Sequence, residues 1–95
     1  MRKYEVMYIL RSDVEQENVQ AIVDKFNAII TNGGGEIEKT DIIGKRRLAY
    51  EINKARDGIY VLVNFSAPVE VIAELDRVMK IADEVIRTLI VKDVA

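Results

Sequence analysis

The sequence has no cysteine and no histidine among its 95 residues, and it has a single proline. Without cysteine and histidine, the chain cannot form disulfides, thiolate nucleophiles, the usual zinc sites or histidine-based acid–base pairs. We therefore expect no metal, no cofactor, no small-molecule substrate and no enzymatic activity. The apolar run after Met1–Glu5 is too short for a signal sequence or a membrane span, so we expect a cytoplasmic protein.

The charges are nearly balanced in number but unevenly distributed. The formal net charge is −2, which argues against a protein that coats nucleic acid indiscriminately. Basic residues gather at the N-terminus, between Lys45 and Arg56 and near the C-terminus, whereas acids concentrate in two helical stretches. Because salt limits the reach of exposed charges to about 8–10 Å, a local basic cluster can still contact nucleic acid.

The length and the 49% hydrophobic content predict one folded domain that covers residues 1–95. Strands are predicted where short runs are rich in branched and aromatic residues, and helices where apolar residues recur at helical spacing. The predicted elements, in chain order, are a strand at 4–10, a helix that begins at Ser12, a strand at 36–52, a strand at 59–65, a helix that opens at Pro68 and a strand at 85–91.

Local signals mark where these elements begin, bend and end. Ser12 and Glu15 have the spacing of a capping box at the start of the first helix. Asn32 and glycines 33–35 end that helix, and the glycines are not a phosphate-binding loop, because such a loop lies between a strand and a following helix. The segment 36–52 would span more than about 50 Å if straight, so we expect two strand pieces hinged at Gly44.

The order strand–helix–strand–strand–helix–strand predicts an α+β protein with the ferredoxin-like split fold. Right-handed crossovers place the first and third strands at the centre of a four-stranded antiparallel sheet, with both helices on one face. The other face is then open to solvent and exposes an apolar patch of a kind that usually marks a partner site, or a homodimer contact. The residues expected on this patch are Met7, Ile9, Tyr60, Leu62, Leu89 and Val91.

Basic residues border this open face. Arginine suits bidentate contacts with phosphate, although a basic hairpin can also serve only to discourage strand aggregation. The RNA-recognition module with this topology carries a basic-Gly-aromatic motif that is missing from 59–65, so contacts with the phosphates of a folded RNA fit better than base reading. The candidate cations are Arg2, Lys3, Lys45, Arg46, Arg47, Lys54, Arg56, Arg87 and Lys92.

The segment Gly44–Ile52, which reads Gly-Lys-Arg-Arg-Leu-Ala-Tyr-Glu-Ile, and the opening Met1–Glu5 resemble the family of bacterial small-subunit ribosomal protein six. The resemblance extends over the whole chain. It implies a non-catalytic component of the small subunit that binds the central domain of 16S ribosomal RNA together with small-subunit protein eighteen.

The resemblance also assigns residues. The matching positions are Arg2, Lys3, Tyr4, Lys45, Arg46, Arg47, Tyr50, Arg87 and Lys92. Among these, Arg2, Arg87 and Lys92 are the favoured RNA contacts, and the hairpin, with Tyr50, is shared between RNA and the partner protein. The chain departs from the family at Ile43, where many relatives have tryptophan, and in its short tail.

Two other functions compete with this interpretation. Acylphosphatases share the topology, but neither their glycine-rich anion loop nor its arginine is present. A ligand-sensing domain would require a deep polar pocket at a dimer interface, whereas the ribosomal function requires a flat apolar face bordered by arginines.

Overall fold

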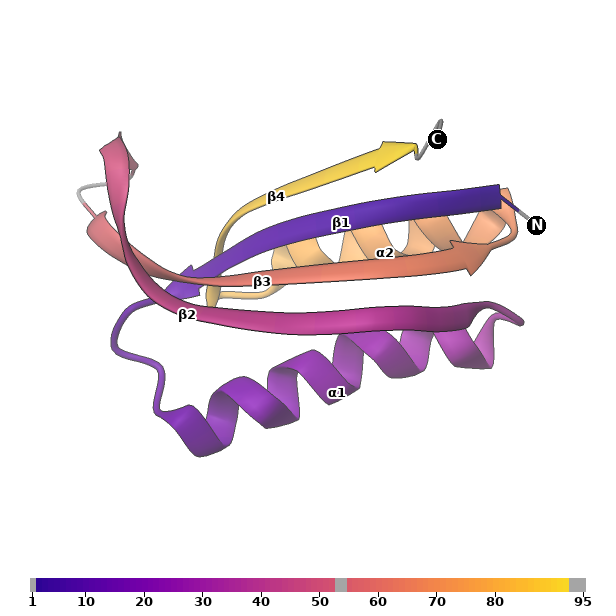
Figure 1. Cartoon of the computed structure of the whole chain (residues 1–95), viewed down its shortest axis with the longest axis horizontal. Helices are drawn as coiled ribbons and strands as arrows, with labels where there is room; N and C mark the ends of the chain where they lie inside the picture. The colour runs from indigo at the N-terminus through magenta and orange to yellow at the C-terminus, as the bar shows by residue number, and fades with distance from the viewer. Residues whose placement is uncertain (1, 53–54, 93–95) are drawn as a thin grey trace.

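The computed structural model describes the backbone at residues 2–52 and 55–92, and the side chains of these residues outside 48–56. Strands and helices follow the predicted order (Figure 1). They are β1 (Arg2–Arg11), α1 (Gln16–Asn32), β2 (Glu36–Ile52), β3 (Ala55–Ala67), α2 (Val69–Ile81) and β4 (Val85–Lys92).

The sheet confirms the predicted ferredoxin-like topology. Its strand order is β2-β3-β1-β4, so β1 and β3 occupy the centre and every neighbouring pair is antiparallel. Met7 of β1 lies opposite Leu62 of β3 on one side and opposite Leu89 of β4 on the other. This register decides which side chains share a face, because cross-strand partners point the same way.

The hydrophobic core lies between the two helices and one face of the sheet. Val6, Tyr8 and Leu10 of β1 are buried there, as their alternation predicted. Each helix contributes one buried stripe: Val19, Val23, Phe26 and Ile30 from α1, and Val71, Leu75 and Met79 from α2. The ring of Tyr8 meets that of Phe26 edge-on at 5.3 Å, which joins β1 to α1.

The predicted capping box is wrong. Helix α1 begins at Gln16, and its N-cap, Glu15, makes no side-chain hydrogen bond to the helix. The segment before it forms a turn in which the Val14 N–H donates to the Arg11 carbonyl at 3.2 Å. Asp13 is also held by Arg11, at 2.7 Å, so these residues carry the chain from the sheet to the helix layer instead of starting the helix.

The glycine run ends α1 as predicted, although the left-handed residue is not the first one. Gly33 has φ −85° and Gly34 has φ +92°. The N–H groups of Gly33, Gly34 and Gly35 donate to carbonyls in the last turns of α1. The run therefore supplies partners for helix carbonyls that would otherwise be unpaired.

Strand β2 is continuous, so the prediction of two separate pieces is wrong, but its pairing with β3 shifts at Gly44. Ile42 lies opposite Val61 and Gly44 opposite Tyr60, which makes Ile43 the extra residue of a bulge. Gly44 has φ +101°, a conformation that favours glycine. β2 curves away from the sheet toward the hairpin in Figure 1. Strand β3 begins at Ala55, four residues before the expected start at residue 59.

The buried hydroxyl of Tyr8 makes stability depend on pH. This hydroxyl has no hydrogen-bond partner within the described part of the chain, and burial, together with the negative charge of Asp24, raises the pKa of Tyr8 above its ordinary value of 10.0. Above about pH 10 the unfolded chain releases a proton that the folded chain retains, so stability falls as pH rises, by at most about 1.4 kcal/mol per pH unit.

We expect Tyr8→Phe to remove this contribution and to leave stability at pH 7 unchanged or higher, because no hydrogen bond is lost. Urea unfolding between pH 7 and pH 11 measures it. Tyr4→Phe is the matched control, since it removes a hydroxyl from a tyrosine that is only partly buried. An equally steep loss of stability in Tyr8→Phe would contradict the assignment.

Close packing around Gly58 predicts a second effect on stability. A Cβ atom at Gly58 would overlap Cγ2 of Ile9 and lie 3.2 Å from the Leu10 carbonyl oxygen. We expect Gly58→Ala to lower the free energy of unfolding by about 1–3 kcal/mol through overpacking. In a double-mutant cycle, Ile9→Ala should absorb part of this cost, so that the double variant loses less than the sum of the singles. If the stability losses of the two single variants simply add in the double variant, the contact between residue 58 and Ile9 is not the cause of the destabilisation.

Candidate RNA and protein interface

The sheet face opposite the helices carries an accessible apolar surface. The register aligns Met7 with Leu62 and Leu89 in one row across the three neighbouring strands β3, β1 and β4. Leu89 and Val91 are 49% and 42% exposed, and the others are half-buried. We call the open-face patch the set Met7, Tyr60, Leu62, Leu89 and Val91.

Ile9 does not belong to this accessible patch, although the alternation of β1 predicts it there. It is on the correct face, opposite Tyr60, but only 3% of it is exposed. The side chain of Ile9 packs over Gly58, which has no side chain of its own. Ile86 also lies close to Gly58: its Cδ1 is 3.8 Å from the position that a Cβ of Gly58 would occupy. Ile9 is therefore a buried packing residue, and it is not available for contact with a partner.

Ile86 is the residue that the sequence analysis missed. Ile9 pairs with Arg87 and Leu10 with Val85, so Ile86 is the extra residue of a bulge in β4. A bulge changes the alternation of side chains, and nothing in the sequence of β4 marks it. The missed residue thus extends the open face toward the Gly58 end.

The basic triplet of β2 is divided between the two faces, because side chains alternate along a strand. Arg46 lies opposite Gly58 and therefore on the open face. Lys45 and Arg47 lie opposite Ile59 and Asp57, on the side that carries the helices. All three are exposed, so they can meet partners on either side of the hairpin.

The remaining candidate cations are divided in the same way. Arg87 and Lys3 lie on the open face, opposite Ile9 and Ser66, and Lys3 is 4.0 Å from Glu38. Arg2 and Lys92 lie on the helix side, where Lys92 is opposite Tyr4. The favoured set of Arg2, Arg87 and Lys92 is thus not on one surface.

Tyr4 is occupied by packing inside the protein. Its ring stacks on that of Phe65, with centroids 5.8 Å apart, and it packs against the edge of the core. Lys54 and the side chains of Tyr50 and Arg56 lie outside the described residues.

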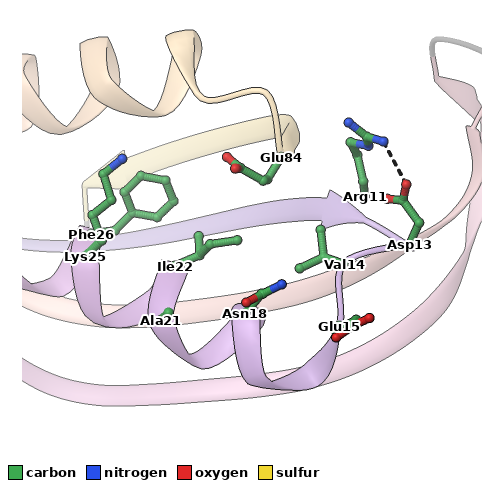
Figure 2. A pocket seen from close by; sticks show the side chains of 10 residues that line it. All are labelled: Arg11, Asp13, Val14, Glu15, Asn18, Ala21, Ile22, Lys25, Phe26 and Glu84. Carbon is green, nitrogen blue, oxygen red and sulfur yellow. Dashed lines mark hydrogen bonds and ion pairs between the residues drawn. The ribbon is translucent and has the colours of Figure 1, made fainter.

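The cleft at the start of α1 does not offer the pocket that a ligand-sensing domain requires. It has a volume of about 570 Å³ and lies between the start of α1 and the loop before β4 (Figure 2). Its floor is apolar, with Val14, Ile22 and Phe26, and Arg11 is already bonded to Asp13, which raises the pKa of Arg11. Every polar or charged residue that lines this cleft is exposed, so none is held ready for a ligand.

Two features are absent from the described part of the chain, residues 2–52 and 55–92. No group of three potential ligands (Asp or Glu in this chain) is placed to hold a metal ion there. No helix there is long and apolar enough to cross a bilayer.

Comparison with known proteins identifies the family. The profile of ribosomal protein S6 matches residues 3–92. Small ribosomal subunit protein bS6 of Halalkalibacterium halodurans is 55% identical, and that of Exiguobacterium sibiricum is 53% identical, each over 98% of both chains. The crystal structure of 30S ribosomal protein S6 from Thermotoga maritima superposes with a TM-score of 0.92 at 30% identity, over 97% of this chain and 87% of that one. The chain therefore belongs to the ribosomal protein S6 family, a family of small-subunit ribosomal proteins and not of enzymes.

Proposed function

We propose that this chain is a structural component of the bacterial small ribosomal subunit in the cytoplasm, where it binds the central domain of 16S ribosomal RNA together with small-subunit protein eighteen. The observation that carries the proposal is the open-face patch with exposed cations on the same face. A flat apolar surface fits a protein partner, whereas a built pocket would fit a small molecule.

The protein partner is assigned to the open-face patch. Leu62 and Met7 form its centre on β3 and β1, and Leu89 and Val91 extend it along β4. Partly exposed apolar side chains on neighbouring strands give a continuous surface. Its burial would contribute about 25 cal/mol per Å² before the entropic cost of association is subtracted. The chain's own helices cannot cover it, because both lie on the other face.

The RNA is assigned to the cations at the border of the patch. Arg87 and Arg46 lie in adjacent rows at the Gly58 end of the open face. Arginine binds phosphate in a bidentate manner and stacks on bases, which suits the edge of a protein–RNA junction. A partner seated on the patch would add its own charges beside these two arginines and so complete a composite surface.

A second cationic group lies at the other end of the sheet. Arg2 and Lys92 share the helix side near Tyr4, so they cannot contact the same RNA surface as Arg87 unless the RNA passes around the end of β4. These two residues therefore form a second, separable set of phosphate contacts in the proposal.

We expect Leu62→Asp to abolish capture of protein eighteen in a pull-down while the fold is retained, because the carboxylate would be buried at the centre of the interface. Val69→Asp is the matched control. Val69 is an equally apolar residue, 59% exposed on the helix side, and an acid is tolerated at the start of a helix. Unchanged capture by Leu62→Asp, with the circular dichroism of the wild type, would remove the patch from the interface.

We also expect the isolated chain to bind central-domain RNA weakly, and its complex with protein eighteen to bind more tightly and with a steep dependence on salt. Arg87→Ala in that complex should weaken binding and reduce the slope of log K against log salt by about one phosphate contact. Lys25→Ala, an exposed cation on α1, should change neither. Tight, salt-insensitive binding by the isolated chain would contradict the proposal. Filter binding over a salt series distinguishes these outcomes.

A further inference from the structure

A carboxylate lies at the border of the open-face patch. Glu5 is on the same face of β1 as Met7, and its cross-strand neighbours are Asn64 of β3 and Val91 of β4. Both neighbours are uncharged, and Glu5 itself is half-buried. Within the described part of the chain, Glu5 forms no ion pair and no side-chain hydrogen bond. An acid without a counter-charge therefore adjoins the apolar surface.

The cations on this end of the open face do not neutralise Glu5. Lys3, two residues before it on β1, lies 4.0 Å from Glu38. Lys39 of β2 is in the same cross-strand row as Glu5, because both lie opposite Asn64. The two strands are about 10 Å apart, however, and no ion pair joins the two side chains. The negative charge of Glu5 is thus available to a partner.

A partner that covers the patch would remove water from Glu5. Val91 is exposed and lies directly opposite Glu5, so a protein that buries Val91 also reaches the carboxylate. An ionised carboxylate that loses its hydration without gaining a counter-charge is strongly unfavourable. The same carboxylate paired with a cation in the interface is not penalised in this way, and it rejects partners that lack the cation.

We propose that Glu5 determines the specificity of this interface by pairing with an arginine or lysine of the protein that covers the open-face patch. The assignment rests on the proposed function and adds the chemistry of the partner: an apolar centre that packs on Met7 and Leu62, with a cation beside it. Asp41, exposed and opposite Leu62 on the β2 side, offers a second carboxylate to such a partner. RNA fits this end of the face poorly, because its phosphates would meet two carboxylates.

The charges of the open face also determine how the partner lies on it. Arg87 is opposite Ile9, four residues along β1 from Glu5, which separates the two rows by about 13 Å. Arg46 lies still further along, opposite Gly58. A partner turned end for end would place its cation beside these two arginines, where like charges repel. The favoured orientation puts the cation at Glu5 and leaves the arginine end of the face for RNA.

Glu5→Gln tests the pairing with little change in side-chain shape. We expect it to weaken the binding of purified protein eighteen about 10- to 30-fold, mainly through faster dissociation, because the partner's cation would lose its counter-charge inside the interface. Glu5→Lys should weaken binding further. Surface plasmon resonance measures both rates, and circular dichroism checks that each variant is folded. Glu17→Lys, at an exposed residue of α1, changes the net charge as Glu5→Lys does and should bind like the wild type.

Charge reversal in both proteins identifies the cation. Each arginine and lysine of protein eighteen is replaced in turn by glutamate, and every variant is measured against the wild-type chain and against Glu5→Lys. One of these variants should bind Glu5→Lys more tightly than it binds the wild type, because the swapped charges attract again. A complete set without such a rescue would overturn the direct pairing.

Three other results would also overturn the pairing. The first is wild-type affinity of Glu5→Gln. The second is an effect confined to the association rate and removed by salt, because Glu5 would then remain solvated in the complex. The third is tighter RNA binding by Glu5→Lys with undiminished binding of protein eighteen, which would assign this end of the face to RNA.

Leu62→Asp separates this inference from the proposed function. If Leu62→Asp abolishes capture while Glu5→Gln and Glu5→Lys bind like the wild type, the patch remains the interface and only the cation at Glu5 is rejected. If Leu62→Asp is captured normally, the patch itself is not the interface, and the role of Glu5 is rejected with it.

Discussion

The pairing of β1 with β3 at the centre of the sheet is the constraint on which the rest of the molecule depends. Both helices connect a central strand to an outer strand, and both return over the same face. The core then forms on that face from residues such as Phe26, Ile30 and Leu75, each worth about 1.5–3 kcal/mol when fully buried. The same arrangement leaves the opposite face of β1, β3 and β4 without cover from the chain's own helices.

The two faces of the sheet therefore have separate roles, although the same strands build both. On the helix side, Val6, Tyr8 and Leu10 are closely packed and determine stability. On the open side, Met7 and its cross-strand neighbours remain available to a partner. Successive side chains of β1 point to opposite faces, so the same strand contributes to the core and to the open face. A substitution on one face leaves the other face largely unchanged.

Bulges in β2 and β4 set the limits of the open apolar surface. At Gly44 a positive φ and one extra residue bend β2 toward the basic hairpin. In β4 the extra residue Ile86 covers Ile9 and ends the accessible patch near Arg87. The bulges thus determine where apolar surface stops and where cations begin, and they leave Thr88–Val91 as the regular part of the β4 edge.

The sequence by itself determined the order of elements, the fold, the buried stripes of both helices and the family, because hydrophobic periods and the Gly44–Ile52 motif are local properties of the chain. The sequence predicted a helix cap at Ser12, but that segment forms a turn before the helix. It also predicted that Ile9 is exposed on the open face, because alternation along a strand indicates the face of a side chain and not how deeply it is buried. Only the tertiary structure decided that Ile86 is the extra residue of a bulge in β4 and that Ile9 is buried over Gly58. The burial of a side chain and its neighbours on a sheet face depend on the register between strands. That register depends on bulges and on pairing with residues that are distant in the chain.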